Sequence, residues 1–173
     1  VIVMPGLMHI DKALELAIES FKGVLIAGPR TGSKTANMNI PKQLPPIVPG
    51  IEGTVASVET LRPNASIAIE AGGKFNCWME NLINYNNIIE RCNDGRPAII
   101  GKKNRQYLAG WPDQEALKRI LSDVCSAQNV SITQLPDCVR VRDTLKHRFW
   151  FNYSETESIV GGIKLPPSGV IWE

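Results

Sequence analysis

Two stretches of the chain repeat their apolar residues with the spacing of an α-helix. In the first, apolar side chains recur every three or four positions: Leu14, Ala17, Ile18 and Phe21. Asp11 stands before this stretch as a suitable N-cap, and Gly23 follows it as a stop signal. In the second, the same spacing recurs behind a cap at Asp113: Leu117, Ile120, Leu121 and Val124. The pattern predicts two amphipathic helices.

Short apolar runs typical of β-strands occur before and after the first helix. Residues 1–7 predict a buried strand, and residues 24–27 predict a second strand directly after the helix. A strand, a helix and a strand with such short connections predict a right-handed βαβ unit with parallel strands. Further strand-like runs follow: 54–58, 66–70, 74–79, 88–91, 96–100 and 106–109. Residues 102–105 predict the turn of a hairpin between the last two runs.

The segment from residue 28 to residue 50 has neither period. Prolines interrupt it repeatedly: Pro29, Pro41, Pro45, Pro46 and Pro49. A long irregular excursion of this kind is usually functional or lies at an interface. We therefore expect residues 41–50 to form part of an interface.

Beyond residue 129 the apolar period changes from that of a helix to that of a strand. Val139 and Val141 alternate with arginines, and aromatic side chains then alternate with other residue types: Phe149, Phe151 and Tyr153. This pattern predicts an antiparallel hairpin, with one more strand at residues 165–172. The sequence thus predicts two domains, residues 1–135 and a small β domain at residues 136–173.

Composition is that of an ordinary folded protein. Of 173 residues, 43% are hydrophobic and 21% are charged, and the net charge of +2 gives no reason to expect a nucleic-acid partner. The basic residues of the hairpin are expected on the outer face of a half-buried sheet: Arg140, Arg142, Lys146 and Arg148. The chain has no run of about 18 apolar residues, so the sequence predicts no membrane span. The first residues do not have the pattern of a signal peptide.

The four cysteines stand far apart, without the spacing of a zinc site: Cys77, Cys92, Cys125 and Cys138. We expect them to be free thiols in a reducing cytoplasm, and we expect no metal or cofactor.

Residues 28–35 match the phosphate-binding G-x-x-x-x-G-K-[ST] pattern except that Ser33 replaces the second glycine. A phosphate loop must open a helix, whose free N–H groups hold the phosphates. Two asparagines and Pro41 follow here instead, with no apolar period. We do not expect nucleotide binding.

Residues for nucleophilic or acid–base catalysis are scattered. The chain has only two histidines, His9 and His147, and each is expected to be incidental rather than catalytic. Glycoside hydrolysis requires two carboxylates about 5–9 Å apart, but no spacing pairs the acidic residues among the strand-like runs: Glu70, Glu80, Glu90 and Asp94. We expect these carboxylates, and those of Glu15, Glu19 and Glu115 on the helices, to lie on solvated faces.

The order of the first elements resembles the core of the class I glutamine amidotransferase-like fold. That resemblance places the cysteine nucleophile near residues 27–29 and the histidine and glutamate near residues 110–113. Trp111 and Asp113 stand at the second position, and neither position has a nucleophile or a base. An amidotransferase reaction is therefore not expected at these junctions.

Several motifs together resemble the non-catalytic C-terminal part of the family 42 glycoside hydrolases, the bacterial β-galactosidases. They follow one another in register over almost the whole chain: residues 28–32 with Asn37, residues 94–98, residues 107–110, the helix at 116–124, residues 149–154 and residues 165–170. Each motif alone is weak, but the series is fairly specific.

This second resemblance implies a three-layer α/β/α amidotransferase-like (flavodoxin-like) domain that holds subunits together as a trimer, followed by a small antiparallel β module. In that family the catalytic glutamates lie in a TIM barrel, which no part of this chain resembles. The resemblance also implies a strand and a helix before residue 1 of the printed chain, and hence an exposed sheet edge.

We therefore expect a homotrimeric assembly region with no catalytic, cofactor or metal residues, which meets a galactoside only through the barrel. The alternative is a small amidotransferase-like enzyme with a relocated nucleophile such as Cys77 or Cys125.

Overall fold

The computed structural model describes all residues from 1 to 173. Contacts divide the chain into two compact units, Val1–Ser131 and Ile132–Glu173. This division falls a few residues before the boundary expected at residue 135. Each unit has its own cluster of buried apolar side chains.

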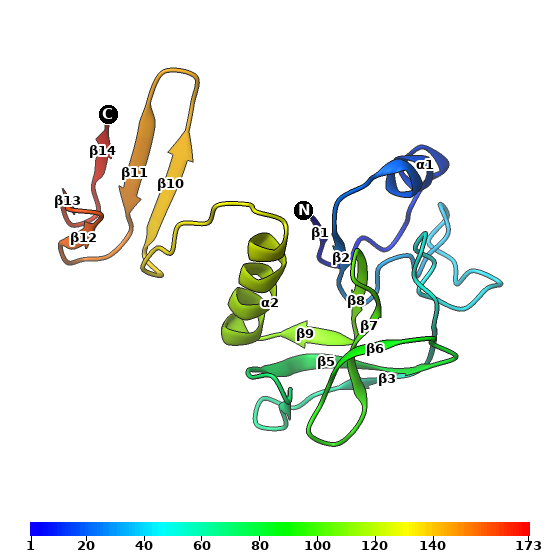
Figure 1. Ribbon diagram of the computed structural model, residues 1–173. Helices are drawn as coiled ribbons and strands as arrows, with labels where there is room; N and C mark the ends of the chain where they lie inside the picture. The colour runs from blue at the N-terminus through cyan, green and yellow to red at the C-terminus, as the bar shows by residue number, and fades with distance from the viewer. The chain divides into compact units, whose positions relative to one another are not determined.

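Both predicted helices are confirmed (Figure 1). Helix α1 spans Lys12–Ser20, and the Asp11 carboxylate caps it by accepting a backbone N–H of the first turn at 2.8 Å. Helix α2 spans Gln114–Ala127, and Asp113 caps it in the same way at 2.9 Å. Neither helix has the length and apolar composition needed to span a bilayer.

The first sheet of unit 1 has five strands in the order β1-β2-β8-β7-β6. Their bounds are Ile2–Met4 for β1, Leu25–Ala27 for β2, Arg105–Leu108 for β8, Pro97–Lys102 for β7 and Ile88–Arg91 for β6. Strands β1, β2 and β8 are parallel, which confirms the predicted βαβ unit, and β7 and β6 continue the sheet antiparallel.

One helix contacts each face of this sheet. On β8, the Arg105 guanidinium donates to the carbonyl of Ile18 in α1 at 3.0 Å. The next residue, Gln106, points to the opposite face because side chains alternate along a strand. There it lines the same cavity as Val124 of α2.

The three-layer α/β/α arrangement expected from the amidotransferase resemblance is not confirmed. The two helices are the only ones, and the chain between β2 and β8 forms strands and an irregular loop instead of crossover helices. The physical reason lies in the sequence, because only the two helical stretches have a period of 3.6 residues. The fold is therefore a sheet-rich α/β arrangement.

A second, antiparallel sheet forms around β5, the longest strand of unit 1. Its strands are β3 at Thr54–Thr60, β5 at Lys74–Ile83, β4 at Ile67–Ala68 and β9 at Gly110–Pro112. Ala109 joins the two sheets: its N–H donates to the carbonyl of Ala98 in β7 at 2.9 Å, and its carbonyl accepts from the N–H of Glu80 in β5 at 2.6 Å. This junction brings β5 against the end of β8.

Strand β1 is not buried as predicted. It lies at the edge of the first sheet and pairs only with β2. The side chains of Val1, Ile2 and Val3 are 38–42% exposed, and only Met4 is buried. An edge strand has a neighbour on one side only, which explains the exposure of these apolar residues.

Unit 2 contains only β-structure. Strands β10 at Val139–Asp143, β11 at Arg148–Asn152 and β14 at Val170–Trp172 form an antiparallel sheet, and β12 at Ser158–Val160 pairs with β13 at Ile163–Leu165. The predicted hairpin is confirmed by the pairing of β10 with β11. The last predicted strand is divided into β13 and β14, because Pro166 and Pro167 interrupt it.

Candidate functional site

The two junctions that the amidotransferase resemblance singles out lie next to each other in unit 1. Gly6 marks their meeting point, because a methyl group added there would lie 3.0 Å from Cη2 of Trp111 and 3.2 Å from the carbonyl oxygen of Pro29. Gly6 also has a φ of 111°, which disfavours any other residue. The Trp111 ring therefore occupies the space beside the β2 junction, and Asp113 is committed to capping α2.

A buried carboxylate, that of Glu80, lies close to the same junction. Its side chain is 3% exposed, which corrects the expectation of a solvated position. Oε1 accepts from the backbone N–H of Arg30 at 3.0 Å and from Nε1 of Trp78 at 3.2 Å, and Oε2 accepts from the hydroxyl of Tyr107 at 2.6 Å. Both oxygens of Glu80 are thus occupied by donors from three separate segments.

The Arg30 backbone adopts the left-handed conformation, with a φ of 68°. A non-glycine residue rarely adopts it, and it persists where neighbouring contacts hold it. Here the Glu80 carboxylate holds the N–H of Arg30, and the guanidinium lies over the Trp78 ring, 5.4 Å from its centroid. The turn after β2 therefore has the geometry of a sharp elbow, but an arginine stands in it and supplies no nucleophile.

Burial raises the pKa of the Glu80 carboxyl, and the hydrogen bonds from Tyr107, Trp78 and Arg30 partly offset this rise. Burial and the nearby Glu80 charge also raise the pKa of the Tyr107 hydroxyl. None of the cavities of unit 1 described below is lined by Glu80 or Tyr107. The arrangement joins the β2 turn to both sheets; it does not present a reactive group to a substrate.

The candidate nucleophiles and bases are not brought together. His9 contacts the Lys34 carbonyl at 3.2 Å, whereas His147 lies in unit 2 with its ring edge-on to Phe149. No hydrogen bond joins either histidine to a cysteine. Cys77 is exposed and Cys92 is buried, where burial raises the pKa of its thiol to about 11. No group of three potential metal ligands is present.

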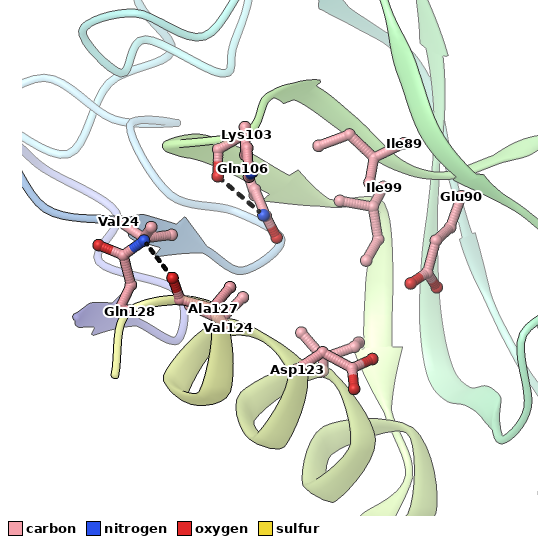
Figure 2. Close-up of a pocket in the computed structure, with 11 residues that line it drawn as sticks. Val24, Ile89, Glu90, Ile99, Lys103, Gln106, Asp123, Val124, Ala127 and Gln128 are labelled. Atoms are coloured by element: carbon pink, nitrogen blue, oxygen red, sulfur yellow. Dashed lines mark hydrogen bonds between the residues drawn. The ribbon is translucent and has the colours of Figure 1, made fainter. Parts of the chain in front are cut away.

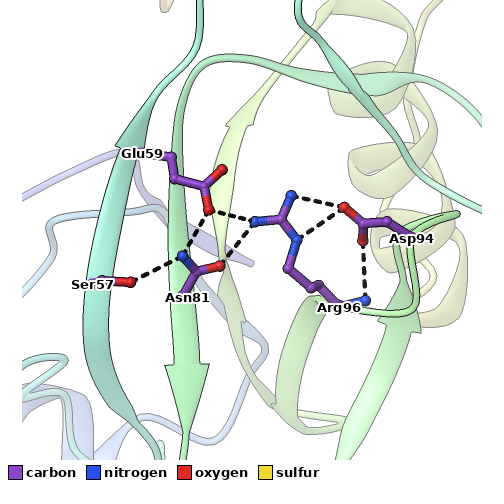
Figure 3. Close-up of polar contacts among 5 residues, drawn as sticks. All are labelled: Ser57, Glu59, Asn81, Asp94 and Arg96. Atoms are coloured by element: carbon purple, nitrogen blue, oxygen red, sulfur yellow. Dashed lines mark hydrogen bonds and ion pairs between the residues drawn. The ribbon is translucent and has the colours of Figure 1, made fainter.

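Of the other acidic residues among the predicted strands, Glu90 and Asp94 are held in ion pairs, whereas Glu70 is exposed. Arg119 donates through both terminal nitrogens to Glu90 at 2.8 Å. Figure 3 shows the Arg96 guanidinium between Asp94 at 2.7 Å and Glu59 at 2.9 Å. Hydrogen bonds from Asn81 and Arg96 hold the pKa of Glu59 below its ordinary value, and the hydrogen bond from Arg96 does the same for Asp94. The Arg119 pair joins α2 to β6, and Arg96 joins the turn before β7 to β3.

The segment at residues 28–35 does not have the geometry of a phosphate loop. No helix follows it before α2. The N–H of Gly32 donates to the carbonyl of Leu7 at 2.9 Å, and the N–H of Lys34 donates to the carbonyl of Met8 at 2.8 Å. These amides are therefore already used within the protein, and a phosphate could not accept from them.

Besides an open cavity of about 360 Å³ lined by residues 70–71 and 88–91, unit 1 has two cavities of moderate size. The first, about 190 Å³, lies between α2 and the five-stranded sheet. Figure 2 shows its apolar wall, with Glu90 and Asp123 at one end and Gln106 and Gln128 at the other. The second, about 220 Å³, lies between α1 and residues 43–51, with Glu15 and Glu19 among its lining residues. Neither brings a nucleophile together with a base.

Sequence reasoning missed one feature of unit 2. The strand register pairs Arg142 with Phe149, and Phe149 with Trp172, so the aromatic rings of β11 and β14 share a face with the arginines. Trp172 is 62% exposed and Tyr153 is 69% exposed. The sequence predicted the alternation along β11. It did not predict which face is buried, because aromatic residues lie on both faces of this strand.

No protein-family model matches the chain. It is 33% identical over 157 residues to a β-galactosidase of Thermus thermophilus and 27% identical over 187 residues to the β-galactosidase BgaA of Thermus sp. The β-galactosidase structure from the psychrophilic Marinomonas ef1 matches 98% of the chain with a TM-score of 0.84 and 30% identity. A catalytic mutant of Gan42B, a GH42 β-galactosidase from G. stearothermophilus, has the same fold over 98% of the chain, with a TM-score of 0.75 at 14% identity.

These matches cover 87% to 99% of this chain but only 24% to 31% of the relatives. The chain thus spans about a quarter to a third of the proteins it resembles. Shared sequence and shared fold over nearly its whole length agree with the resemblance that its motifs predicted. In sequence and fold, the chain corresponds to one region of β-galactosidases.

Proposed function

We propose that this chain is a non-catalytic assembly region of a β-galactosidase. In this proposal, unit 1 is the amidotransferase-like domain that holds subunits together as a homotrimer in the cytoplasm. A TIM barrel outside the chain then catalyses the hydrolysis of terminal β-galactosides. Support comes from the relatives, which are β-galactosidases, and from the junctions of unit 1, where Trp111 and Arg30 stand in place of reactive groups.

The observation that carries the proposal is the surface of the long loop after β2. Four of its large apolar side chains are exposed within ten residues: Met38 at 58%, Ile40 at 71%, Leu44 at 50% and Ile47 at 36%. Exposed apolar clusters of this kind mark interaction sites. Burying such a side chain completely contributes roughly 1.5–3 kcal/mol, so a partner that covers this loop gains substantial free energy.

Light scattering coupled to size-exclusion chromatography tests the proposal over a series of chain concentrations. We expect a trimer at high concentration and no hydrolysis of a nitrophenyl galactoside by this chain. The double variant Ile40→Ser/Leu44→Ser should dissociate at higher concentrations than the parent, because it loses buried apolar area. Leu145→Ser is the matched control, since Leu145 is fully exposed in a turn of unit 2. A monomer at every concentration, or galactoside turnover by the chain alone, would overturn the proposal.

A further inference from the structure

One face of the unit 2 sheet carries aromatic rings and arginines together. Along β11 the ring centroids of Phe149 and Phe151 are 6.4 Å apart, and those of Phe151 and Tyr153 are 6.3 Å apart. Across the sheet, Trp172 lies 6.3 Å from Phe149. We call this surface the ring face and define it by six residues: Arg140, Arg142, Phe149, Phe151, Tyr153 and Trp172.

The composition of the ring face is that of a protein interface. Interface cores are enriched in aromatic residues and arginine and depleted in lysine and acids. The one acid of β10, Asp143, alternates to the opposite side, where it pairs with Arg148. Arg140 donates to the carbonyls of Asp137 and Val139, whereas the Arg142 side chain makes no hydrogen bond or ion pair. The complement of this face is an apolar surface that offers a carboxylate.

Unit 1 presents apolar and acidic side chains together at the 220 Å³ cavity between α1 and residues 43–51, which we call the loop groove. Its lining includes Pro46, Ile47 and Pro49. Glu15 is already paired with Lys12 at 3.0 Å. The Glu19 side chain makes no hydrogen bond or ion pair, so its carboxylate is available at the groove.

We propose that the ring face of one copy of this chain docks on the loop groove of a second copy, with Arg142 opposite Glu19. Contact between two ring faces would instead place arginines against arginines, which is unfavourable. A contact between two different surfaces leads from one copy to the next, and it closes a trimeric ring when each step rotates by one third of a turn. The inference therefore rests on the proposed trimer and names its contacting surfaces.

Charge reversal tests this pairing in the full chain by sedimentation velocity over a concentration series. Arg142→Glu alone and Glu19→Lys alone should each raise the dissociation constant about tenfold or more, because like charges then oppose each other. The double variant Arg142→Glu/Glu19→Lys should return it to within about threefold of the parent, since the two sites then couple. Arg62→Glu and Glu70→Lys are matched controls at exposed positions outside both surfaces and should leave it unchanged.

Circular dichroism of each variant checks that it folds, and Trp172→Ser provides a second disruption that does not depend on charge. If the chain assembles but the single reversals weaken it no more than the controls, or the double variant is not rescued, the docking is wrong while the assembly function stands. A chain that stays monomeric refutes both. If the reversals change the hydrodynamic radius of a monomer, the ring face contacts its own chain, which also overturns the proposal.

Discussion

The buried carboxylate of Glu80 makes the stability of unit 1 depend on pH. Since its pKa is raised in the folded state, the folded protein keeps a proton that the unfolded chain has already released. Between the ordinary carboxyl pKa and the raised value, stability therefore falls as pH rises. Asp94 and Glu59 act in the opposite sense: their lowered pKa values stabilise the fold above the ordinary carboxyl range, and this stabilisation is lost on acidification.

Substituting Glu80 separates these opposing effects. Glu80→Gln can still accept from Arg30 and Trp78, and Tyr107 can turn its hydroxyl to accept from the new amide. We expect this variant to gain stability relative to the parent as pH rises from about 4.5 towards 7.

Urea unfolding followed by tryptophan fluorescence at several pH values measures the difference. Tyr107→Phe is expected to lose about 1–3 kcal/mol at neutral pH, because Oε2 of Glu80 is then buried without a donor. Glu70→Gln, at an exposed carboxylate, is the control. Parallel pH profiles for the parent and Glu80→Gln would contradict the assignment.

Single residues could be predicted where their role is local. Asp11 and Asp113 were identified as caps because a cap and its helix are adjacent in sequence. The role of Glu80 could not be found in this way, since two of its three donors lie 50 residues before it and 27 residues after it and meet only where the two sheets join. The only local signal was an acidic residue within the apolar run of β5.

Among the elements, the end of β11 depends most on one side chain. Asn152 is 2% exposed, and its amide donates to the carbonyls of Thr156 at 2.8 Å and Pro166 at 3.0 Å. Its side-chain oxygen accepts from the backbone N–H of Ser154 at 3.0 Å. Asn152 thereby fixes the loop after β11 and the chain after β13 to each other.

Asn152→Ala should destabilise unit 2 by about 2–4 kcal/mol, because it leaves several buried backbone groups without partners. Hydrogen exchange measured by mass spectrometry should show lost protection in β11 and β13 and unchanged protection in unit 1. Asn64→Ala is the matched control, at an exposed turn position of unit 1. Unaltered exchange in β13 would show that other contacts hold this loop.

The elements with one apolar face were predicted best. The two helices follow directly from their spacing, whereas β11 has apolar or aromatic residues on both sides and its buried face depends on what packs there. Trp150 is buried and Phe149 is half-exposed, although both are large aromatic residues in the same strand. Register and packing, not residue type, decide between them.

At the scale of the whole molecule, the motif series predicted the similarity to β-galactosidases, but the amidotransferase resemblance implied more helices than the two that form. A family resemblance carries the order of conserved segments, whereas a layer of helices requires an apolar period in every crossover. Residues 54–83 have the strand period instead, so the chain forms β3, β4 and β5 there. The two compact units meet at residues 131 and 132, within the segment between α2 and β10 where the apolar period changes.

This division predicts how the chain responds to proteolysis. Residues 128–138 contain no helix or strand, and Val130 and Ile132 are 44% and 47% exposed. Thermolysin cuts before apolar residues, so limited digestion should cleave first in this segment. Unit 1 should then persist, whereas unit 2, at about 40 residues, is near the size below which a domain rarely folds alone and should be degraded. Mass spectrometry of a digestion time course identifies the cuts. The double variant Val130→Asp/Ile132→Asp should slow these cuts. Ile40→Asp is the control and should not slow them, because Ile40 lies in the long loop of unit 1. If the first cut instead falls within that loop, the loop opens more readily than the connection between the units.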